Sequence, residues 1–184
     1  MNTFKSPIVY IKNWLKRPDY DYEYFMGIEW DERTPARREA FFATVTDEYT
    51  YGSGDYARTY APRPMDVNVE LIGEQISDKY AFDPYELCFL NMYPNERNQL
   101  GWHADDAESI DHTRPIAVIS LGAERELWIK PIDGTAADVE KVRLGHGSLL
   151  LMNPGMQFTH YHRIPKNDRP CGPRISLTYR GFKK

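Results

Sequence analysis

Apolar residues recur with two different periods along the chain, and the period changes near Pro84. Upstream of it, apolar residues follow one another at steps of three and four, at Val69, Ile72, Ile76 and Tyr80. This spacing is typical of one buried helix face. Asp66 precedes the run as a candidate N-cap, so we predict a helix from Asp66 through Tyr80.

The rest of the N-terminal half has weaker patterns. Ile8–Leu15 predicts a short strand, and Asp19–Met26 predicts a helix because its apolar residues have helical spacing. Residues 31–65 are polar and interrupted by proline and glycine, which favours short strands joined by loops. This last segment also holds five arginines and four tyrosines.

Downstream of Pro84 the pattern is that of short strands separated by glycines. We predict strands at Glu86–Tyr93, Ile116–Leu121, Glu126–Ile129, Ser148–Met152 and Arg174–Arg180. Short strands at this spacing after a helix indicate a jelly roll or a similar barrel. The expected fold is α+β and a single domain over residues 1–184. A helix and strand extension over about residues 1–85 would pack on a double-stranded β-helix (jelly-roll) core over about residues 86–184.

Composition narrows the class of protein. The 184 residues are 41% hydrophobic, which is enough for a globular core. The net charge of −4 argues against a protein that coats nucleic acid, although a local basic patch remains compatible with it. The two cysteines have no zinc-like spacing, and no apolar run approaches the roughly 20 residues of a membrane span. We therefore expect a soluble, cytoplasmic protein with no signal segment and no membrane partner.

Candidate metal ligands lie far apart in the sequence. His103 and Asp105 are two residues apart, so on extended backbone both side chains point to one side and can reach one ion. By itself this pair is weak evidence, and a solvated loop is the favoured alternative. His160 and His162 are both candidates for a third ligand, and strand parity does not choose between them. Two histidines and one carboxylate form a facial triad, which leaves half of an Fe(II) coordination sphere open.

A candidate anion site lies on the last predicted strand. Strict alternation places Arg174 and Arg180 on the same face, and guanidinium groups bind carboxylates bidentately. The alternative is an edge strand with both arginines in water. Asn91 and Tyr93 share a face of an earlier strand and would add an amide and a phenol. Iron beside two arginines implies O₂ activation with the dicarboxylate 2-oxoglutarate as cosubstrate.

These residues lie within longer motifs that can be compared with a known family. The matching segments are Asn91–Tyr93, Gly101–Asp106, Pro115–Gly122, His146–Met152, His160–Pro165 and Pro173–Arg180. In these segments the chain resembles the AlkB-type Fe(II)/2-oxoglutarate-dependent dioxygenases, and most of all their nucleic-acid alkylation-repair branch. The resemblance is dense over roughly residues 86–182 and loose in the N-terminal half.

The resemblance implies a function and assigns roles to residues. His103, Asp105 and His162, and not His160, would be the catalytic iron ligands. The expected 2-oxoglutarate-binding residues are Asn91, Tyr93, Arg174 and Arg180, with Arg174 and Tyr93 at the distal carboxylate. The implied reaction is oxidative demethylation of N-alkylated bases (1-methyladenine/3-methylcytosine type) in DNA or RNA, which consumes O₂ and converts 2-oxoglutarate to succinate.

Substrate residues are expected both beside the iron and in a nucleotide-recognition lid at residues 31–65. Asp106 and Glu108 would read the base, although Ala107 stands where the family commonly has an acidic residue. A base must leave its duplex to reach the iron, so stacking partners are required. The stacking candidates are Tyr51, Tyr60, Trp102 and His103, and the phosphate-contact candidates are Arg37, Arg38 and Arg58.

We expect a monomer whose partner is alkylated nucleic acid, with DNA favoured over RNA. The first alternative is a 2-oxoglutarate-dependent hydroxylase of a protein or small molecule, which would keep the metal and the arginines and differ in the lid. A second alternative is a non-catalytic nucleic-acid-binding module on a jelly roll.

Overall fold

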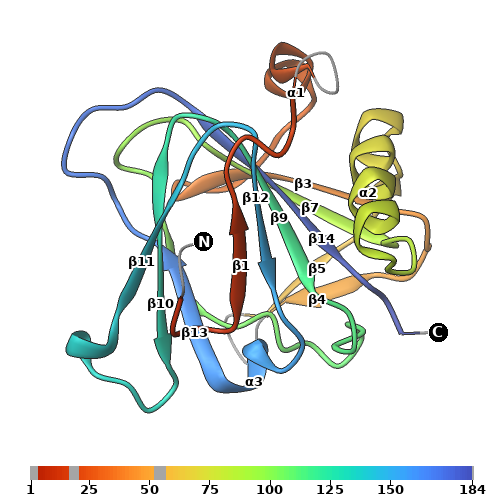
Figure 1. The fold of residues 1–184 in the computed structure, drawn as a ribbon. Coiled ribbons are helices and arrows are strands. Elements are labelled where there is room, and N and C mark those ends of the chain that lie inside the picture. The colour runs from red at the N-terminus through yellow and green to blue at the C-terminus, as the bar shows by residue number, and fades with distance from the viewer. Residues whose placement is uncertain (1–3, 17–20, 52–56, 184) are drawn as a thin grey trace.

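Two mainly antiparallel β-sheets face each other in this computed structural model, which describes residues 4–16, 21–51 and 57–183. The larger sheet has the strand order β1 (Ile8–Ile11), β12 (Ser148–Met152), β9 (Ile116–Gly122), β14 (Arg174–Arg180), β7 (Leu87–Tyr93), β3 (Arg37–Ala43) and β2 (Asp31–Thr34). The short strand β6 (Arg63–Pro64) pairs in parallel with β3. The smaller sheet has the order β11 (Glu140–Leu144), β10 (Arg125–Pro131), β13 (His160–Ile164) and β8 (Leu100–His103). This arrangement confirms the predicted jelly-roll core (Figure 1).

Helices and a hairpin are added to these two sheets. The helices are α1 (Tyr22–Gly27), α2 (Val67–Tyr80) and α3 (Met156–Thr159), with a 3₁₀ turn η2 (Ala136–Asp138) between β10 and β11. Strands β4 (Tyr49–Tyr51) and β5 (Arg58–Tyr60) form a separate antiparallel hairpin. Within the described residues, no helix is long and apolar enough to cross a membrane.

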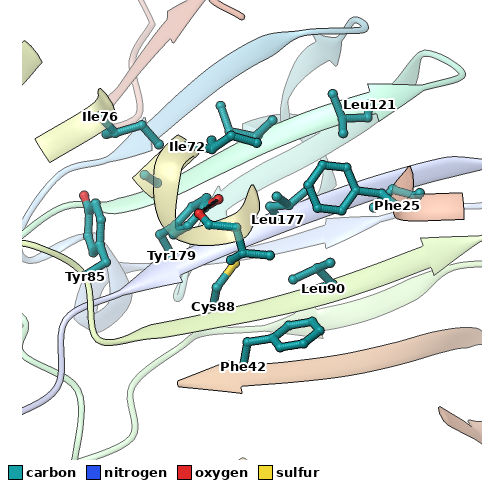
Figure 2. Close-up of a cluster of buried hydrophobic side chains, with 14 of the residues drawn as sticks. Phe25, Phe42, Ile72, Ile76, Tyr85, Cys88, Leu90, Leu121, Leu177 and Tyr179 are labelled. Carbon is teal, nitrogen blue, oxygen red and sulfur yellow. Dashed lines mark hydrogen bonds between the residues drawn. The ribbon is translucent and has the colours of Figure 1, made fainter. Parts of the chain in front are cut away.

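Helix α2 starts where the sequence predicts. The Asp66 carboxylate caps it by accepting hydrogen bonds from the backbone N–H groups of Asn68 and Val69. The helix covers the outer face of the larger sheet, where Ile72 and Ile76 pack over Leu177 and Tyr179 (Figure 2). Helix α1 has its N-cap at Asp21, while Asp19, where the predicted helix begins, lies outside the described residues.

The central strands of the larger sheet are buried on both faces. Along β14, Ile175, Leu177 and Tyr179 join the hydrophobic cluster under α2. The alternating residues of β14, Arg174 to Arg180, point instead into the space between the two sheets. Strand β7 behaves in the same way, with Asn91 and Tyr93 turned inward. The fold therefore places a row of polar side chains inside an apolar barrel.

Candidate metal and diacid site

The three candidate metal ligands converge in the space between the two sheets. His103 ends β8, Asp105 lies in the loop that follows, and His162 pairs with His103 from β13. Their candidate ligand atoms all lie within 4.8 Å of one another. Two imidazoles and one carboxylate around one point are the donor set of a facial Fe(II) site, so these residues could hold that metal.

The local environment prepares both imidazoles for a metal. The Nδ1–H group of His103 donates to the Gly101 carbonyl at 2.8 Å, which leaves Nε2 as the ligand nitrogen. Burial and the neighbouring His103 lower the pKa of His162 to about 3, so this ring is neutral at physiological pH. The two rings lie 4.1 Å apart between centroids. Neutral imidazole is the form that binds metals.

Asp105 is held in its ionised form. Burial alone would raise its pKa, but Arg180, together with the two histidines, brings the pKa down to about 2. Arg180 Nη2 lies 2.8 Å from Asp105 Oδ2. The other carboxylate oxygen, Oδ1, is buried and has no hydrogen-bond partner among the described residues. A cation bound to that oxygen would satisfy it, which is the fit expected for a metal ligand.

Gln157 fixes the backbone at this ligand. Its side-chain carbonyl accepts a hydrogen bond from the Asp105 N–H at 2.9 Å, and its amide contacts Met152 Sδ at 3.4 Å. Gln157 lies in α3 and is buried. The sequence analysis missed this residue, because nothing in the local pattern connects positions 52 residues apart.

Arg174 lies deep in the same space and is incompletely paired. Its Nη2 donates to Ser120 Oγ at 2.7 Å, and its guanidinium carbon lies 5.3 Å from the centre of the Tyr93 ring. Its Nε and Nη1 atoms are buried without a hydrogen-bond partner among the described residues. Burial lowers the pKa of Arg174 to about 10, so the group is still a cation at pH 7. A buried, unneutralised guanidinium is energetically costly, and a carboxylate bound to it would remove that cost.

The cavity around Arg174 also reaches the metal ligands. It is lined by Asn91, Tyr93, Arg174, Arg180 and the three metal-ligand candidates, with apolar walls from Leu127, Leu144, Leu150 and Ile164. A diacid lying in it could touch Arg174 at one end and the metal at the other. The structure therefore brings together all seven residues that the sequence assigns to the metal and the diacid.

A second pocket adjoins this cavity and has aromatic walls. It shares Asn91, His103, Asp105 and Arg180 with the diacid cavity and adds Arg37, Tyr49, Tyr60 and Phe89. Tyr49 and Tyr60 come from the β4–β5 hairpin and are 1% and 2% exposed. The Tyr60 and Phe89 rings meet edge to face at 4.9 Å. Aromatic walls of this kind next to the metal have the chemistry that a flat aromatic or heterocyclic ligand stacks against.

A buried polar network joins the hairpin to the diacid cavity. The Tyr60 hydroxyl donates to Glu39 Oε2 at 3.0 Å, and Glu39 Oε1 pairs with Arg37 Nη2 at 2.5 Å. Arg37 Nε then donates to Asn91 Oδ1 at 2.7 Å. No sequence pattern indicates Glu39, since a buried carboxylate is recognisable only once its partners are known.

The structure brings only some of the predicted substrate residues to the aromatic-walled pocket. Tyr60 and Arg37 line it, but Arg37 is buried and paired rather than exposed to a phosphate. Trp102 lies outside the pocket, on the outer face of the smaller sheet between Lys130 and Arg163. Arg38 is half-exposed and pairs with Glu32 at 2.7 Å, while Arg58 is exposed.

The remaining substrate candidates are two loop residues and one residue whose side chain the structure does not describe. Asp106 and Glu108 are exposed in the loop after Asp105. The side chain of Tyr51 lies outside the described residues, although its backbone belongs to β4. Tyr49, two residues earlier, is the member of that strand whose buried ring lines the pocket. Burial raises the pKa of Tyr49, and the carboxylates of Asp105 and Asp106 also contribute.

The two facing sheets, the ligand triad and the buried arginine define the class of protein. The family model for the 2OG-Fe(II) oxygenase superfamily matches residues 10–180, and the chain belongs to this superfamily. The resemblance to AlkB-type members is confirmed by curated relatives.

Two of these relatives are named for dioxygenase or demethylase activity. Alpha-ketoglutarate-dependent dioxygenase alkB homolog 3 of Bos taurus is 31% identical over 180 residues, which covers 90% of this chain and 62% of that protein. DNA oxidative demethylase ALKBH2 of Mus musculus is 27% identical over 150 residues, covering 78% and 61%. The chain thus spans about three-fifths of the length of these relatives.

A solved structure supports the fold. The structure of OsALKBH1 has a TM-score of 0.65 and 18% identity, and the match covers 97% of this chain and all of that one. At this identity the likeness concerns the jelly-roll fold alone.

Proposed function

We propose that this chain is an Fe(II)/2-oxoglutarate-dependent dioxygenase that oxidatively demethylates N-alkylated bases in DNA or RNA. One observation carries the proposal. The metal-ligand triad lies between a cavity that ends at a buried, incompletely paired arginine and a pocket walled by tyrosine and phenylalanine. The first arrangement suits a small diacid, and the second suits a planar base. The relatives' names point to the same chemistry.

The diacid is assigned to the cavity by charge. Arg174, with the Tyr93 hydroxyl, would bind the distal carboxylate of 2-oxoglutarate, because the free Nε and Nη1 donors of Arg174 match a carboxylate bidentately. Arg180 would lie beside the C1 carboxylate while it keeps Asp105 ionised. Asn91 would complete this end of the cavity. The apolar walls exclude water and strengthen both ion pairs.

The base is assigned to the aromatic-walled pocket. Tyr49 and Tyr60 would contact the ring of a base that has left its stack, and each such stacking contact contributes about 1–3 kcal/mol. N-methylation at the Watson–Crick edge of adenine or cytosine makes the base cationic. The carboxylate of Asp106, in the loop after Asp105, would favour that charge over the neutral base.

When bound, Fe(II) with 2-oxoglutarate and O₂ supplies the oxidation of an N-alkyl carbon, and the products are succinate, CO₂, an aldehyde and the unmodified base. The contribution of the chain is to orient these reactants. His103, Asp105 and His162 fix the metal, Arg174 fixes the diacid, and the tyrosines present the alkyl group to the metal.

The test is mass spectrometry of oligonucleotides carrying 1-methyladenine or 3-methylcytosine after incubation with enzyme, iron, ascorbate and 2-oxoglutarate. We expect loss of the methyl mass and succinate formation that depends on the methylated strand. Succinate formation unaffected by any methylated strand would instead favour a hydroxylase of a protein or small molecule. Absence of 2-oxoglutarate binding would exclude both activities.

A further inference from the structure

The outer face of the smaller sheet carries an unusual grid of side chains. The strand register places Trp128 between Lys141 and Arg163, and Lys130 beside Tyr161. Directly opposed residues share one face of a sheet. The alternating residues, including Leu127, Val142 and Ile164, point into the barrel, so this grid points outward.

We call this surface the aromatic–cation face, and its members share a strand position that points away from the barrel. They are Trp102, Glu126, Trp128, Lys130, Lys141, Arg143, Tyr161 and Arg163. Four are cations, three are aromatic and one is a carboxylate, although the whole chain has a net charge of −4. The excess of positive charge on this face is therefore local.

Aromatic rings and cations are interleaved at close distance across this face. Lys141 lies 4.3 Å and Arg163 4.8 Å from the Trp128 ring centre. Arg163 and Lys130 each lie 5.4 Å from the Trp102 ring centre. The cations are thus held in place before any ligand arrives, which lowers the entropy lost on binding.

The carboxylates on this side of the molecule neutralise the face only weakly. Arg143 approaches Glu124 and Glu126 at 3.9 and 3.8 Å, and its side chain is 73% exposed. Exposed pairs at such distances contribute little to stability. Glu126 also accepts a hydrogen bond from the Trp128 indole at 2.8 Å. Arg143 therefore remains available to a polyanion, and Lys130, which donates to the Gly134 carbonyl at 3.1 Å, keeps two further N–H donors.

The face is close to the metal site, and no helix in the described part of the chain covers it. Trp102 is adjacent in sequence to His103, and these two side chains point to opposite faces of β8, the last strand of the smaller sheet. Helix α2 covers the larger sheet on the other side of the molecule from β10 and β11 (Figure 1). Strand β8 therefore links this face, through Trp102, to the metal-ligand candidate His103.

We propose that the aromatic–cation face binds the backbone of a single nucleic-acid strand whose alkylated base occupies the aromatic-walled pocket. Sheet faces that combine aromatic side chains with cations bind single strands by stacking bases and neutralising phosphates. This inference rests on the proposed function and extends it from the base to the flanking nucleotides. The simpler view, that the stacks only stabilise an exposed sheet, predicts no change in strand affinity when the lysines are removed.

The test uses the metal-free full chain and fluorescence anisotropy. Labelled, unmethylated strands of roughly 12 nucleotides, one of DNA and one of RNA, are titrated at several salt concentrations. We compare the double variant Lys130→Ala/Lys141→Ala with the control Lys79→Ala/Lys183→Ala. The control removes the same charge in the last turn of α2 and after the end of β14, away from the aromatic–cation face.

We expect the double variant to lower the slope of log K against log salt by about 1.4, or about 0.7 per lost phosphate contact. Its Kd should rise on the order of tenfold near 0.1 M salt, and the control should match the wild type. The strand that binds with the lower Kd, DNA or RNA, is the type of nucleic acid that the face prefers. An unchanged slope and Kd in the double variant, or no binding of either strand by the wild type, would overturn the proposal.

Turnover separates this inference from the proposed function. The double variant should raise the KM for a methylated strand of roughly 12 nucleotides and leave the KM for a methylated strand of about three nucleotides unchanged. If the variant and the wild type have the same KM for the long strand as well as for the short one, the role of the aromatic–cation face is rejected, while the demethylase activity still stands. Absence of methyl loss from any strand would reject the demethylase, and the anisotropy result would still decide whether the face binds nucleic acid.

Discussion

Gln157 accepts a hydrogen bond from the backbone N–H of Asp105 at 2.9 Å, across 52 residues of sequence. Through this bond helix α3 fixes the loop that carries the metal-ligand carboxylate. Gln157 is buried, so no water replaces the bond when the side chain is changed. We interpret Gln157 as a positioning residue for the metal site, because its side chain contacts Asp105 but does not itself line the cavity.

Gln157→Met should therefore weaken Fe(II) binding with little change in the fold. The new side chain has a similar shape but cannot accept the hydrogen bond, and loss of such a supporting contact typically lowers metal affinity 10- to 100-fold. Metal titration measures the effect, and circular dichroism checks the fold. Gln75→Met, on the exposed side of α2, is the matched control. Equal iron affinity in Gln157→Met and the wild type would remove the positioning role.

The third metal ligand can be assigned by comparing two histidines of the same strand. His162 is buried beside Asp105, with Nε2 4.0 Å from Oδ2, whereas His160 is only half-buried and contacts the Thr159 hydroxyl at 2.8 Å. His162→Ala should abolish iron-dependent succinate formation, because it removes a nitrogen that would bind the metal. His160→Ala removes no metal ligand and should retain this activity within about twofold. Retained turnover in a folded His162→Ala protein would contradict the assignment.

Alternation made the diacid site predictable from sequence. Strand β14 places Arg174 and Arg180 on one face with apolar residues on the other, and this pattern requires no knowledge of distant contacts. The same argument applies to Asn91 and Tyr93 in β7. Trp102 is the instructive contrast, since its direct neighbour His103 points inward and a strand turns adjacent side chains to opposite faces. Its outward position on the smaller sheet thus follows from the same rule.

Other parts of the site depend on contacts that the sequence does not encode locally. Tyr49 becomes a wall of the aromatic pocket only because the β4–β5 hairpin packs on Phe41 and Phe89. Strand β8 contains a glycine and only four residues, so its pattern is too short for a prediction. Strand β11 alternates charged and apolar residues and escaped prediction because it lies next to a glycine-rich turn. The role of residues 31–65 as a lid stays a prediction.

Arg174→Met should raise the KM for 2-oxoglutarate by at least about 30-fold. Loss of a buried charge partner reduces the binding free energy by about 2 kcal/mol or more. In the absence of the diacid the same variant should be as stable as the wild type or more so, because the unneutralised charge is gone. Thermal unfolding with and without 2-oxoglutarate measures both effects. An unchanged KM would show that the arginine does not bind the cosubstrate.

Arg125→Met is the matched control for the stability effect. Arg125 is equally buried, but its guanidinium donates to the carbonyls of Asn95, Asn98 and Pro165. Its removal leaves three acceptors without their donor and should destabilise the protein by about 3 kcal/mol. If both variants lose the same stability, then Arg174 is a structural residue and the unpaired donors carry no functional meaning.

The stability of the metal-free protein should fall as the pH is lowered from about 6.5 to about 3. The folded state keeps His162 neutral, with its pKa lowered to about 3, while the unfolded chain takes up a proton near its ordinary value of 6.5. Between these values the unfolded state binds more protons, so the free energy of unfolding decreases with falling pH. The pKa of His103 is lowered by burial as well and acts in the same direction.

His162→Gln should remove one of the protons that the wild type takes up on unfolding. Near pH 5 the free energy of unfolding of this variant should fall with decreasing pH less steeply than that of the wild type, by about 1.4 kcal/mol per pH unit. Urea unfolding at several pH values measures the slope, and His112→Gln is a control in the same chain. Parallel curves for the wild type and His162→Gln would mean that the buried imidazole already carries its proton in the folded state.

Removal of the two tyrosine hydroxyl groups in the aromatic-walled pocket should have opposite effects on the stability of the protein. The Tyr49 hydroxyl is buried with no hydrogen-bond partner in the described parts of the chain, whereas the Tyr60 hydroxyl donates to Glu39. Tyr49→Phe should stabilise the protein by about 1 kcal/mol and raise the KM for the methylated strand, because the free hydroxyl is available only to a ligand. Tyr60→Phe should destabilise it by about 2 kcal/mol, since Glu39 loses a donor. Chemical denaturation and strand titration of both variants separate the two roles, and a Tyr49→Phe protein with lower stability and unchanged KM would show that this hydroxyl supports the fold instead.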